Sequence, residues 1–281
     1  MTIKEIDDAI EEGQSLKQIA EAYSDIANLK VKRIRVAVER NRLFFEEISQ
    51  VFSLVKKLAI KKKVNILKPK KIVSIILTSN YRFYGNINSK LIDFFLNSTS
   101  KFQTDKIILG KAAIDYFRTK GENINTGVVL KTDQPNEVEL INLVNMVKDY
   151  NQVLVFYSSL KSLLVQEPKV ADITATSSIA SNVNKNSSDF QFIFEPELPK
   201  ILNFFETQII TLLLEETFLE SELARTASRF ISMDRSETEA NKFINEYERL
   251  KKQAKRNLDN NTILENFASL AALKKGAYIS R

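Results

Sequence analysis

The sequence lacks the side chains on which most enzyme and metal sites depend. None of its 281 residues is cysteine, histidine or tryptophan. These absences exclude thiolate nucleophiles, imidazole bases, disulfides and the usual zinc ligands. Any catalysis would have to rest on Asp, Glu, Lys, Ser or Tyr. We therefore predict no catalytic, cofactor-binding or metal-binding residues in this chain.

Glycine and proline are also scarce, with six and five occurrences, and they are unevenly placed. Neither residue occurs between Gly13 and Pro69, nor between Pro199 and Gly276. Because glycine and proline are the strongest interruptions of regular structure, each of these two segments can run as a nearly continuous helix.

Both helical segments carry apolar residues at alternating spacings of three and four, which is the pattern of a coiled-coil seam. In the N-terminal segment the predicted seam positions are Ile3, Ile6, Ile10, Leu16, Ile19, Tyr23 and Ile26, then Ile48, Val51, Val55 and Leu58. In the C-terminal segment they are Leu202, Phe205, Ile209, Leu212, Leu219, Leu223, Met233, Ser236, Ala240, Phe243, Tyr247, Leu250 and Ala254. Since both helices join the same middle region, we expect them to pair antiparallel.

The middle of the chain changes to short apolar runs rich in β-branched residues, which are typical of a buried parallel sheet. The predicted strands are residues 71–78, 106–109 and 152–157, and the predicted helices are residues 90–96, 111–119 and 137–150. The last helix opens with a capping box of Asn136 and Glu139. Alternating strands and helices indicate a Rossmann-like domain. Residues 167–189, rich in Ser, Thr, Asn and Ala, are predicted to form a long mobile loop.

These patterns predict an α/β fold class, with a long antiparallel coiled coil of the two terminal helices plus a Rossmann-like α/β globular domain. The N-terminal coiled-coil helix is placed at residues 1–68, the globular domain at 69–198 and the C-terminal coiled-coil helix at 199–281. No apolar run approaches the roughly 20 residues that a membrane span needs. The acidic start of the chain is also unlike a secretory signal. We expect a cytoplasmic protein.

The chain carries a net charge of +6, and many of its lysines are grouped. The group comprises Lys56, Lys57, Lys61, Lys62, Lys63, Lys68, Lys70 and Lys71. Such a run is either a solvated surface or an electrostatic site for an acidic partner, anionic lipid or nucleic acid. Aromatic residues are not interleaved with these lysines, which argues against a stacking surface for single-stranded nucleic acid.

Gly110 and Lys111 follow a predicted strand and precede a predicted helix, as in a phosphate-binding loop. The rest of that motif is missing, because residue 105 is Asp where the motif has Gly and residue 112 is Ala where it has Ser or Thr. We do not predict a nucleotide site there.

A turn of unusual composition, Ser-Asn-Tyr-Arg-Phe-Tyr-Gly-Asn-Ile-Asn-Ser, runs from Ser79 to Ser89 between a strand and a helix. In open α/β sheets, ligands bind at the carboxyl ends of strands. The alternative is a purely structural turn, in which Gly85 supplies backbone freedom and Asn88 or Ser89 caps the following helix. Chemistry alone favours the structural alternative.

The same turn resembles the Ser-Asp-Arg-Gly-Leu-Cys-Gly-Gly-Leu-Asn-Ser segment of the gamma subunits of F-type ATP synthases. Other stretches resemble that family in the same order. They are Lys17–Lys30, Val155–Tyr157 with Leu160–Pro168, Phe194–Pro196, Glu220–Ser221, Arg229, Met233, Ala240, Ala254, Glu265 and Ala271–Leu273. The resemblance covers nearly the whole chain.

The resemblance implies a non-catalytic rotor, the central stalk that couples ATP hydrolysis or synthesis in an alpha3-beta3 hexamer to rotation. It implies hexamer contacts at Lys30, Arg229, Met233, Lys255, Arg256 and Glu265, and a globular-domain turn motif of Ser79, Arg82, Gly85, Asn88 and Ser89. ATP and Mg are then bound by the partner subunits, and no nucleic acid is involved. An epsilon-like subunit or another protein at the foot of the stalk is a further expected partner, while a membrane ring is left open. The resemblance also implies that this chain lies in the cytoplasm, peripheral to the inner face of the cell membrane.

The chain also departs from the family pattern. Asn80, Tyr81 and Arg82 replace Asp-Arg-Gly, Tyr84 replaces Cys, and Arg256 replaces a neutral amide. Residues 274–281 extend beyond the usual end. These departures suggest a divergent, ATP-hydrolysing F-like motor without proton translocation, such as those of mollicutes, some of which are linked to gliding motility. A freestanding coiled-coil adaptor and an α/β enzyme or basic nucleic-acid binder remain as alternatives.

Overall fold

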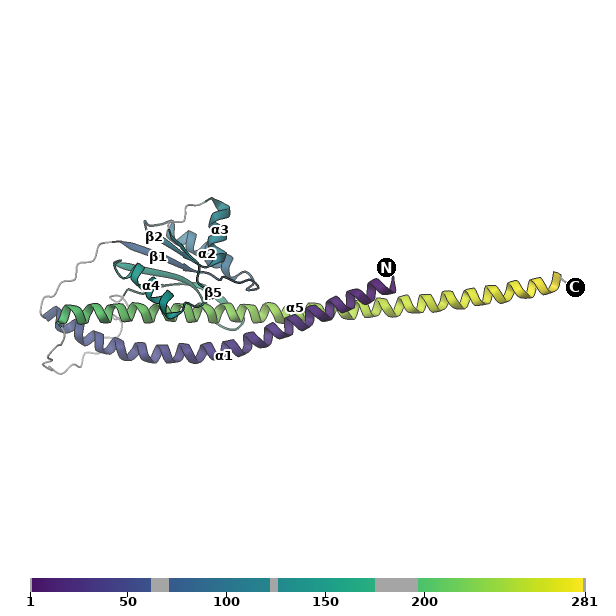
Figure 1. Cartoon of the computed structure of the whole chain (residues 1–281), viewed down its shortest axis with the longest axis horizontal. Helices are drawn as coiled ribbons and strands as arrows, with labels where there is room; N and C mark the ends of the chain where they lie inside the picture. The colour runs from purple at the N-terminus through teal and green to yellow at the C-terminus, as the bar shows by residue number, and fades with distance from the viewer. Residues whose placement is uncertain (1, 62–70, 122–125, 175–196, 280–281) are drawn as a thin grey trace. The chain divides into compact units, whose positions relative to one another are not determined.

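The protein is described by a computed structural model that covers residues 2–61, 71–121, 126–174 and 197–279 (Figure 1). Two long helices, α1 (Ile3–Lys61) and α5 (Leu198–Ile279), enclose in sequence an α/β region. Within the described residues, no helix is both long and apolar enough to cross a membrane.

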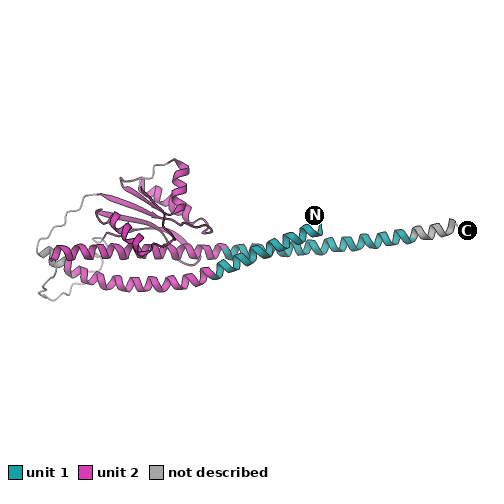
Figure 2. Ribbon diagram, in the orientation of Figure 1, with its two compact units in different colours: residues 1–25, 233–281 teal, residues 26–232 magenta. Residues whose placement is uncertain are grey.

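Packing divides the chain into two compact units, shown in different colours in Figure 2. One unit comprises residues 1–25 and 233–281, and the other comprises residues 26–232. The boundaries between the units fall inside α1 and α5, so each of these helices contributes residues to both units. The second unit therefore contains the whole sheet together with parts of both long helices, whereas the sequence prediction assigned the helices to segments of their own.

Helices α1 and α5 pair antiparallel within each unit, as predicted. In the first unit Asp7 forms an ion pair with Lys251, with 2.6 Å between Oδ1 and Nζ, and Gly13 lies against Phe243 and Ile244. In the second unit the Nδ2 of Asn41 donates to the Leu212 carbonyl at 3.2 Å. The Phe52 and Phe205 rings lie 6.2 Å apart in the same unit. Along each pairing, residue numbers rise in one helix as they fall in the other.

The buried face of α1 repeats every seven residues. Its buried positions include Ile6, Gly13, Ala20, Ala27, Ile34, Asn41 and Val55. A second row of buried or half-buried positions includes Ile3, Ile10, Val31, Val38, Phe45 and Phe52. This is a heptad seam, and in its first half the closest positions are small residues that let the helices approach each other.

Part of the predicted α1 seam is wrong. Ile3, Ile6, Ile10, Ile48 and Val55 do lie on the paired face, but Leu16, Ile19, Tyr23, Ile26 and Val51 are exposed, and the side chain of Leu58 lies outside the described residues. The prediction followed the large apolar residues, whereas the seam continues through Gly13, Ala20 and Ala27. On α5 the predicted positions from Leu202 to Leu223, and Met233, are buried or half-buried, while Ser236, Phe243 and Leu250 are exposed.

Among the described residues, the sheet has five strands in the order β3-β2-β1-β4-β5. They are β1 (Ile72–Leu77), β2 (Asp105–Leu109), β3 (Thr126–Val128), β4 (Gln152–Leu160) and β5 (Gln166–Asp172). The first four are parallel, and β5 pairs antiparallel with β4 at one edge. The parallel core with crossover helices confirms the predicted Rossmann-like domain.

Helices cover both faces of the sheet. The helices of the α/β region are α2 (Ile87–Thr99), α3 (Lys111–Lys120) and α4 (Glu137–Val147). On one face α4 and α5 bury Leu143, Val144, Ile210, Leu214 and Phe218 against the strands. On the other face α2 and α3 bury Leu91, Phe95, Ile114 and Phe117. The predicted capping box of α4 is present, with Asn136 and Glu139 bonded reciprocally.

The predicted loop at 167–189 is wrong over its first part, because residues 166–172 form strand β5. Its polar composition is that of an edge strand, and Pro168 is tolerated there since one side of an edge strand makes no ladder. Residues 175–189 lie outside the described residues, as do the Phe194–Pro196 motif and four of the eight grouped lysines. Of this lysine group, only the Lys71 side chain is described.

Candidate functional site

The Ser79–Ser89 turn leaves the carboxyl end of β1 and is closed by its own polar side chains. The Ser79 N–H donates to the Asn88 Oδ1 at 3.3 Å, and the Asn88 Nδ2 donates to the Ser79 Oγ at 2.7 Å. Asn88 therefore joins the two ends of the turn and does not cap α2. Asn86 occupies the cap position without a side-chain cap bond, and Ser89 is exposed in the first turn of α2.

Gly85 has a left-handed backbone, with φ of 58°, and so uses the backbone freedom that the structural alternative assigned to it. A Cβ at this position would lie 3.4 Å from the hydroxyl oxygens of Ser228 and Ser232 on α5, so the turn approaches the helix closely. Phe83 also has a positive φ, 67°, which is an uncommon conformation for a large side chain. The turn therefore lies close to α5 at Gly85 and contains one uncommon backbone conformation, at Phe83.

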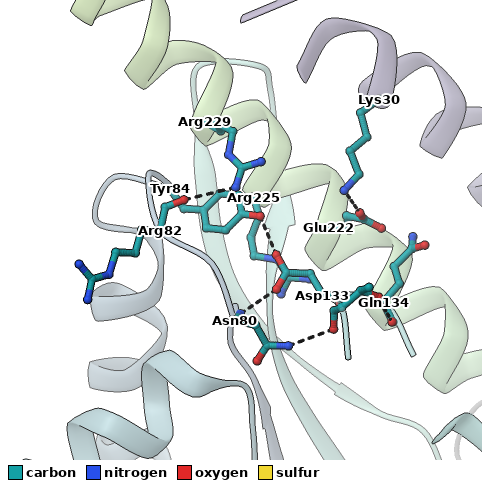
Figure 3. Close-up of polar contacts among 10 residues, drawn as sticks. Lys30, Asn80, Arg82, Tyr84, Asp133, Gln134, Glu222, Arg225 and Arg229 are labelled. Carbon is teal, nitrogen blue, oxygen red and sulfur yellow. Dashed lines mark hydrogen bonds and ion pairs between the residues drawn. The ribbon is translucent and has the colours of Figure 1, made fainter. Parts of the chain in front are cut away.

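Asp133 is the centre of the polar contacts at this place (Figure 3). Its carboxylate is buried and accepts two hydrogen bonds, from the Asn80 N–H to Oδ1 at 2.7 Å and from the Tyr84 O–H to Oδ2 at 2.6 Å. Its backbone carbonyl accepts a third, from the Nη2 of Arg225 at 3.1 Å. Asp133 thus joins the turn, the loop before α4 and helix α5.

Tyr84 is buried between the turn and α5. Burial raises the pKa of its phenol well above the ordinary value, and the hydrogen bond to Asp133 raises it further. The guanidinium carbon of Arg229 lies 4.2 Å from the centre of the Tyr84 ring, in cation–π geometry. The Ser228 hydroxyl donates to the Tyr84 carbonyl at 2.8 Å, and the Arg229 Nη2 donates to the Arg82 carbonyl at 3.3 Å.

Asn80 uses both ends of its amide. Its Nδ2 donates to the carbonyls of Leu130 and Thr132 at 2.9 and 3.0 Å, and its Oδ1 accepts from the Lys111 N–H at 3.0 Å. An ionised Asp at this position could not donate to the two carbonyls. The departure of this chain from the Asp of the family motif therefore changes which bonds the turn can make.

The first three backbone N–H groups of α3 all have acceptors within the described part of the chain. The N–H groups of Lys111, Ala112 and Ala113 donate to Asn80, to the Ser79 carbonyl and to the Thr78 hydroxyl. A phosphate-binding loop needs these donors for its ligand. This helix start is therefore a joint between α3 and the turn.

The remaining polar contacts connect α5 to α1 and to itself. Arg225 is 2 % exposed, and its Nη1 donates to the Ser221 hydroxyl at 2.9 Å. Glu222 is 4 % exposed and forms an ion pair with Lys30 of α1. Lys30 was predicted to be a partner contact; here it neutralises a buried carboxylate of its own chain.

The structure divides the predicted residues between the two units. One unit contains predicted residues of the turn itself and two on the adjoining helices. Among them are Ser79, Arg82, Gly85 and Asn88 in the turn, Arg229 on α5 and Lys30 on α1. Met233, Lys255, Arg256 and Glu265 belong to the other unit, where Met233 is 8 % exposed and the last three are exposed on α5. Their predicted contacts with a hexamer stay predictions.

Sequence reasoning missed Asp133, Glu222 and Arg225. Asp133 lies in a polar loop and Arg225 is separated from it by 92 positions, so no local spacing joins them. The available signal was an arginine inside an otherwise small and apolar stretch, Leu223 to Ala227, of a predicted buried helix. A buried arginine requires acceptors from elsewhere in the fold.

Comparisons with known proteins agree over nearly the whole chain. A family model described as ATP synthase matches residues 2–273. The ATP synthase gamma chain of Haemophilus influenzae (strain PittGG) is 25% identical and covers 96% of this chain and 99% of its own. The gamma chain of Staphylococcus haemolyticus is 21% identical, with 87% and 90% covered.

Solved structures show the same fold. A chain from the central stalk and c-ring of the Tetrahymena thermophila mitochondrial ATP synthase has a TM-score of 0.57 at 18% identity, covering 77% of this chain and 98% of that chain. A chain from the rotor of the Euglena gracilis mitochondrial ATP synthase also has a TM-score of 0.57, at 12% identity, covering 91% and 99%.

Proposed function

The chain belongs to the ATP synthase family, and from this membership we propose that it is the central stalk, the gamma-type rotor, of an F-type or F-like rotary ATPase. One observation carries the proposal. The similarity to gamma chains extends over both long helices and the sheet between them, and so covers the complete rotor architecture. A rotor performs no bond chemistry, which fits a sequence without histidine or cysteine.

The proposed partners are alpha- and beta-type subunits that form a hexamer around the paired helices. Those subunits would bind the ATP and Mg, and this chain would bind neither. As each beta subunit changes shape during hydrolysis, an asymmetric shaft makes different contacts with each of them. Rotation and the catalytic states are then coupled through differences in binding free energy.

The exposed face of α5 suits contacts that must break and re-form. Lys255, Arg256 and Glu265 are exposed there. Exposed ion pairs contribute about 0–1 kcal/mol each, so they can be exchanged during a turn without holding the shaft in place. We propose these three side chains, together with Lys30, Arg229 and Met233, as the contacts with the hexamer.

At the other end of the motor we propose a partner at the foot of the stalk, such as an epsilon-like subunit, and a cytoplasmic position next to the inner face of the cell membrane.

Whether the motor synthesises or hydrolyses ATP is a separate question. The side chains of Asn80 and Tyr84, which depart from the family motif, donate to the Leu130 and Thr132 carbonyls and to the Asp133 carboxylate, respectively. This rebuilt turn supports, as a second candidate, a specialised ATP-hydrolysing motor without proton translocation, such as one of mollicute gliding machinery.

The test is to isolate the native complex through a tag on this chain. We expect alpha- and beta-type ATPase subunits to co-purify, and the ATPase activity of the hexamer to change when this chain is removed. A chain that purifies alone, with a hexamer indifferent to its removal, supports the freestanding adaptor instead. Salt-dependent binding to DNA or RNA would support a basic nucleic-acid binder. A complete subunit list separates the proton-linked motor from the specialised one, according to whether a membrane ring is present.

A further inference from the structure

Helix α5 meets the α/β region through two kinds of contact. Residues Ile210, Leu214 and Phe218 pack on the apolar face of the sheet. Farther along, residues 221–229 meet the turn and the loop before α4 through hydrogen bonds. Apolar packing is largely non-directional, whereas hydrogen bonds weaken steeply away from their preferred angles. The second group of contacts is therefore the more sensitive to a small rotation of α5 about its own axis.

Arg225 is the buried side chain of α5 that reaches the loop. It donates to the Asp133 carbonyl, while the Asp133 carboxylate is held by Asn80 and Tyr84. One residue of an α-helix corresponds to a rotation of about 100°, so a change of even one position would carry Arg225 away from Asp133. The Asp133 carbonyl would then lose its donor, and the buried Arg225 guanidinium would keep only its bond to Ser221 of the same helix.

Two further contacts also fix the rotational position of α5 against the turn. The Ser228 hydroxyl donates to the Tyr84 carbonyl, and the Arg229 guanidinium lies over the Tyr84 ring. Both come from the turn of α5 that follows Arg225, so Tyr84 is held from α5 on one side and from Asp133 on the other (Figure 3).

We propose that Tyr84, Asp133 and Arg225 form a register lock, which fixes the rotational position of α5 against the sheet and passes torque from the helix to the sheet. The inference rests on the proposed rotor function, since torque is carried only if the chain rotates. The lock uses one residue in which this chain departs from the family motif, because the Tyr84 hydroxyl holds the Asp133 carboxylate, whereas the bond from Asn80 comes from its backbone N–H.

The absence of native cysteine allows the lock to be tested in the native complex. A rotation probe is attached through one introduced cysteine, either Lys90→Cys on α2 or Lys200→Cys on α5, both exposed positions. Each probe is followed in the otherwise unchanged chain, in Tyr84→Phe, in Arg225→Met and in the double variant. Tyr81→Phe is the control, because Tyr81 is an exposed tyrosine of the same turn.

We expect the lock variants to reduce the torsional stiffness measured at Lys90→Cys by about twofold or more, because directional bonds between α5 and the sheet are lost. The stiffness measured at Lys200→Cys should stay within error, because that probe sits on α5 itself. Tyr81→Phe should change neither value. If the torsional stiffness fell at both probe positions together, the chain would be loosened as a whole, and the proposed lock would be overturned.

Unchanged stiffness at Lys90→Cys in an assembled variant complex also overturns it. If Arg225→Met does not assemble, Tyr84→Phe decides the matter alone, since it removes a single hydroxyl. Failure of the proposed function is seen separately and earlier, as a probe that does not rotate in the complex with the unaltered lock.

Discussion

At the scale of single residues, Gly110 is the position where the backbone leaves no choice. It has a φ of 98°, and a Cβ there would lie 2.2 Å from the Thr78 carbonyl oxygen. Gly121 offers a matched control, because it has a φ of 69° but no atom near its Cβ position. The two glycines separate the cost of an unusual backbone from the cost of a steric clash.

We predict that Gly121→Ala lowers the free energy of unfolding by about 1–2 kcal/mol, the ordinary cost of a left-handed alanine. Gly110→Ala should cost about 3 kcal/mol more, because strand β1 and the start of α3 must also move apart. Urea unfolding of the two variants measures the difference. Equal losses would mean that the contact with Thr78 carries no strain.

Tyr84 predicts a dependence of stability on alkaline pH. Its pKa is raised in the folded chain by burial and by Asp133, whereas an unfolded tyrosine titrates at about 10. Below that pH both states hold the proton and the stabilisation is complete. Above it the unfolded state loses its proton first, so stability falls as pH rises. We expect this fall from about pH 10 upward, in chemical unfolding measured across that range.

Tyr84→Phe should make the alkaline fall shallower and should cost about 1–3 kcal/mol at neutral pH, because Asp133 Oδ2 loses its donor. The fall does not vanish, since burial and the neighbouring Glu220 also raise the pKa of Tyr157. Tyr81→Phe is the control and should change neither quantity. An alkaline profile of Tyr84→Phe that superimposes on the unaltered one contradicts the prediction.

Residue-level contacts were predicted from the sequence only where they are local. The capping box of Asn136 and Glu139 and the left-handed Gly85 depend on a few adjacent positions, and both are present. The bonds of Asp133 to Asn80, Tyr84 and Arg225 join segments far apart in the chain. Such contacts exist only after the sheet has brought the segments together, so no spacing in the sequence reveals them.

At the scale of elements, the position of α1 against α5 is decided by small side chains. Ala20 is 3% exposed, whereas its neighbour Ile19 is 54% exposed. The sequence analysis chose Ile19 for the seam because it is large and apolar. Close approach of two helices requires the opposite property, and an apolar residue outside the seam is left for contacts with something other than α5.

This arrangement predicts an inverted response to mutation. Ala20→Leu should destabilise the helix pair by about 1–3 kcal/mol, because a larger side chain does not fit the seam. Ile19→Ser should change stability by no more than about 0.5 kcal/mol, because the residue is exposed. Hydrogen exchange of residues 3–25 reports both. If exchange became faster in Ile19→Ser and stayed unchanged in Ala20→Leu, the seam expected from the sequence would be the correct one.

Of the two strands that the sequence did not predict, β3 and β5, strand β5 shows why some elements are missed while others are found. Strands β1, β2 and β4 are buried on both faces and read as continuous apolar runs. Strand β5 lies at the edge, pairs only with β4, and carries Glu167, Pro168 and Lys169. A polar segment with a proline is typical of a loop, and only its neighbour in the sheet makes it a strand.

At the scale of the whole molecule, the residues proposed to contact the hexamer differ in burial. Arg256 is exposed, so Arg256→Glu should reverse a surface charge without affecting the fold. Met233 is buried, so Met233→Trp should strain the helix pair as well as any contact with a partner. The two substitutions therefore separate a loss of contact from a loss of structure.

We expect Arg256→Glu to lower coupled ATPase turnover of the complex with the melting temperature of the isolated chain unchanged. Met233→Trp should lower both. Exposed Arg249→Glu on the same helix is the charge-matched control. If neither Arg256→Glu nor Met233→Trp changed the ATPase turnover, α5 would not be part of the proposed contact surface.

Winding direction follows from the seven-residue spacing of the α1 seam. An α-helix has 3.6 residues per turn, so a strict seven-residue repeat makes paired helices coil around each other in a left-handed sense. Twisting such a pair further in that sense presses its seam together, while the opposite twist opens it. Clockwise and anticlockwise loads are therefore not equivalent for this protein. One is resisted where α5 side chains such as Phe243 and Ile244 lie close against Gly13 of α1, and the other by polar contacts between the helices, such as the ion pair of Asp7 with Lys251.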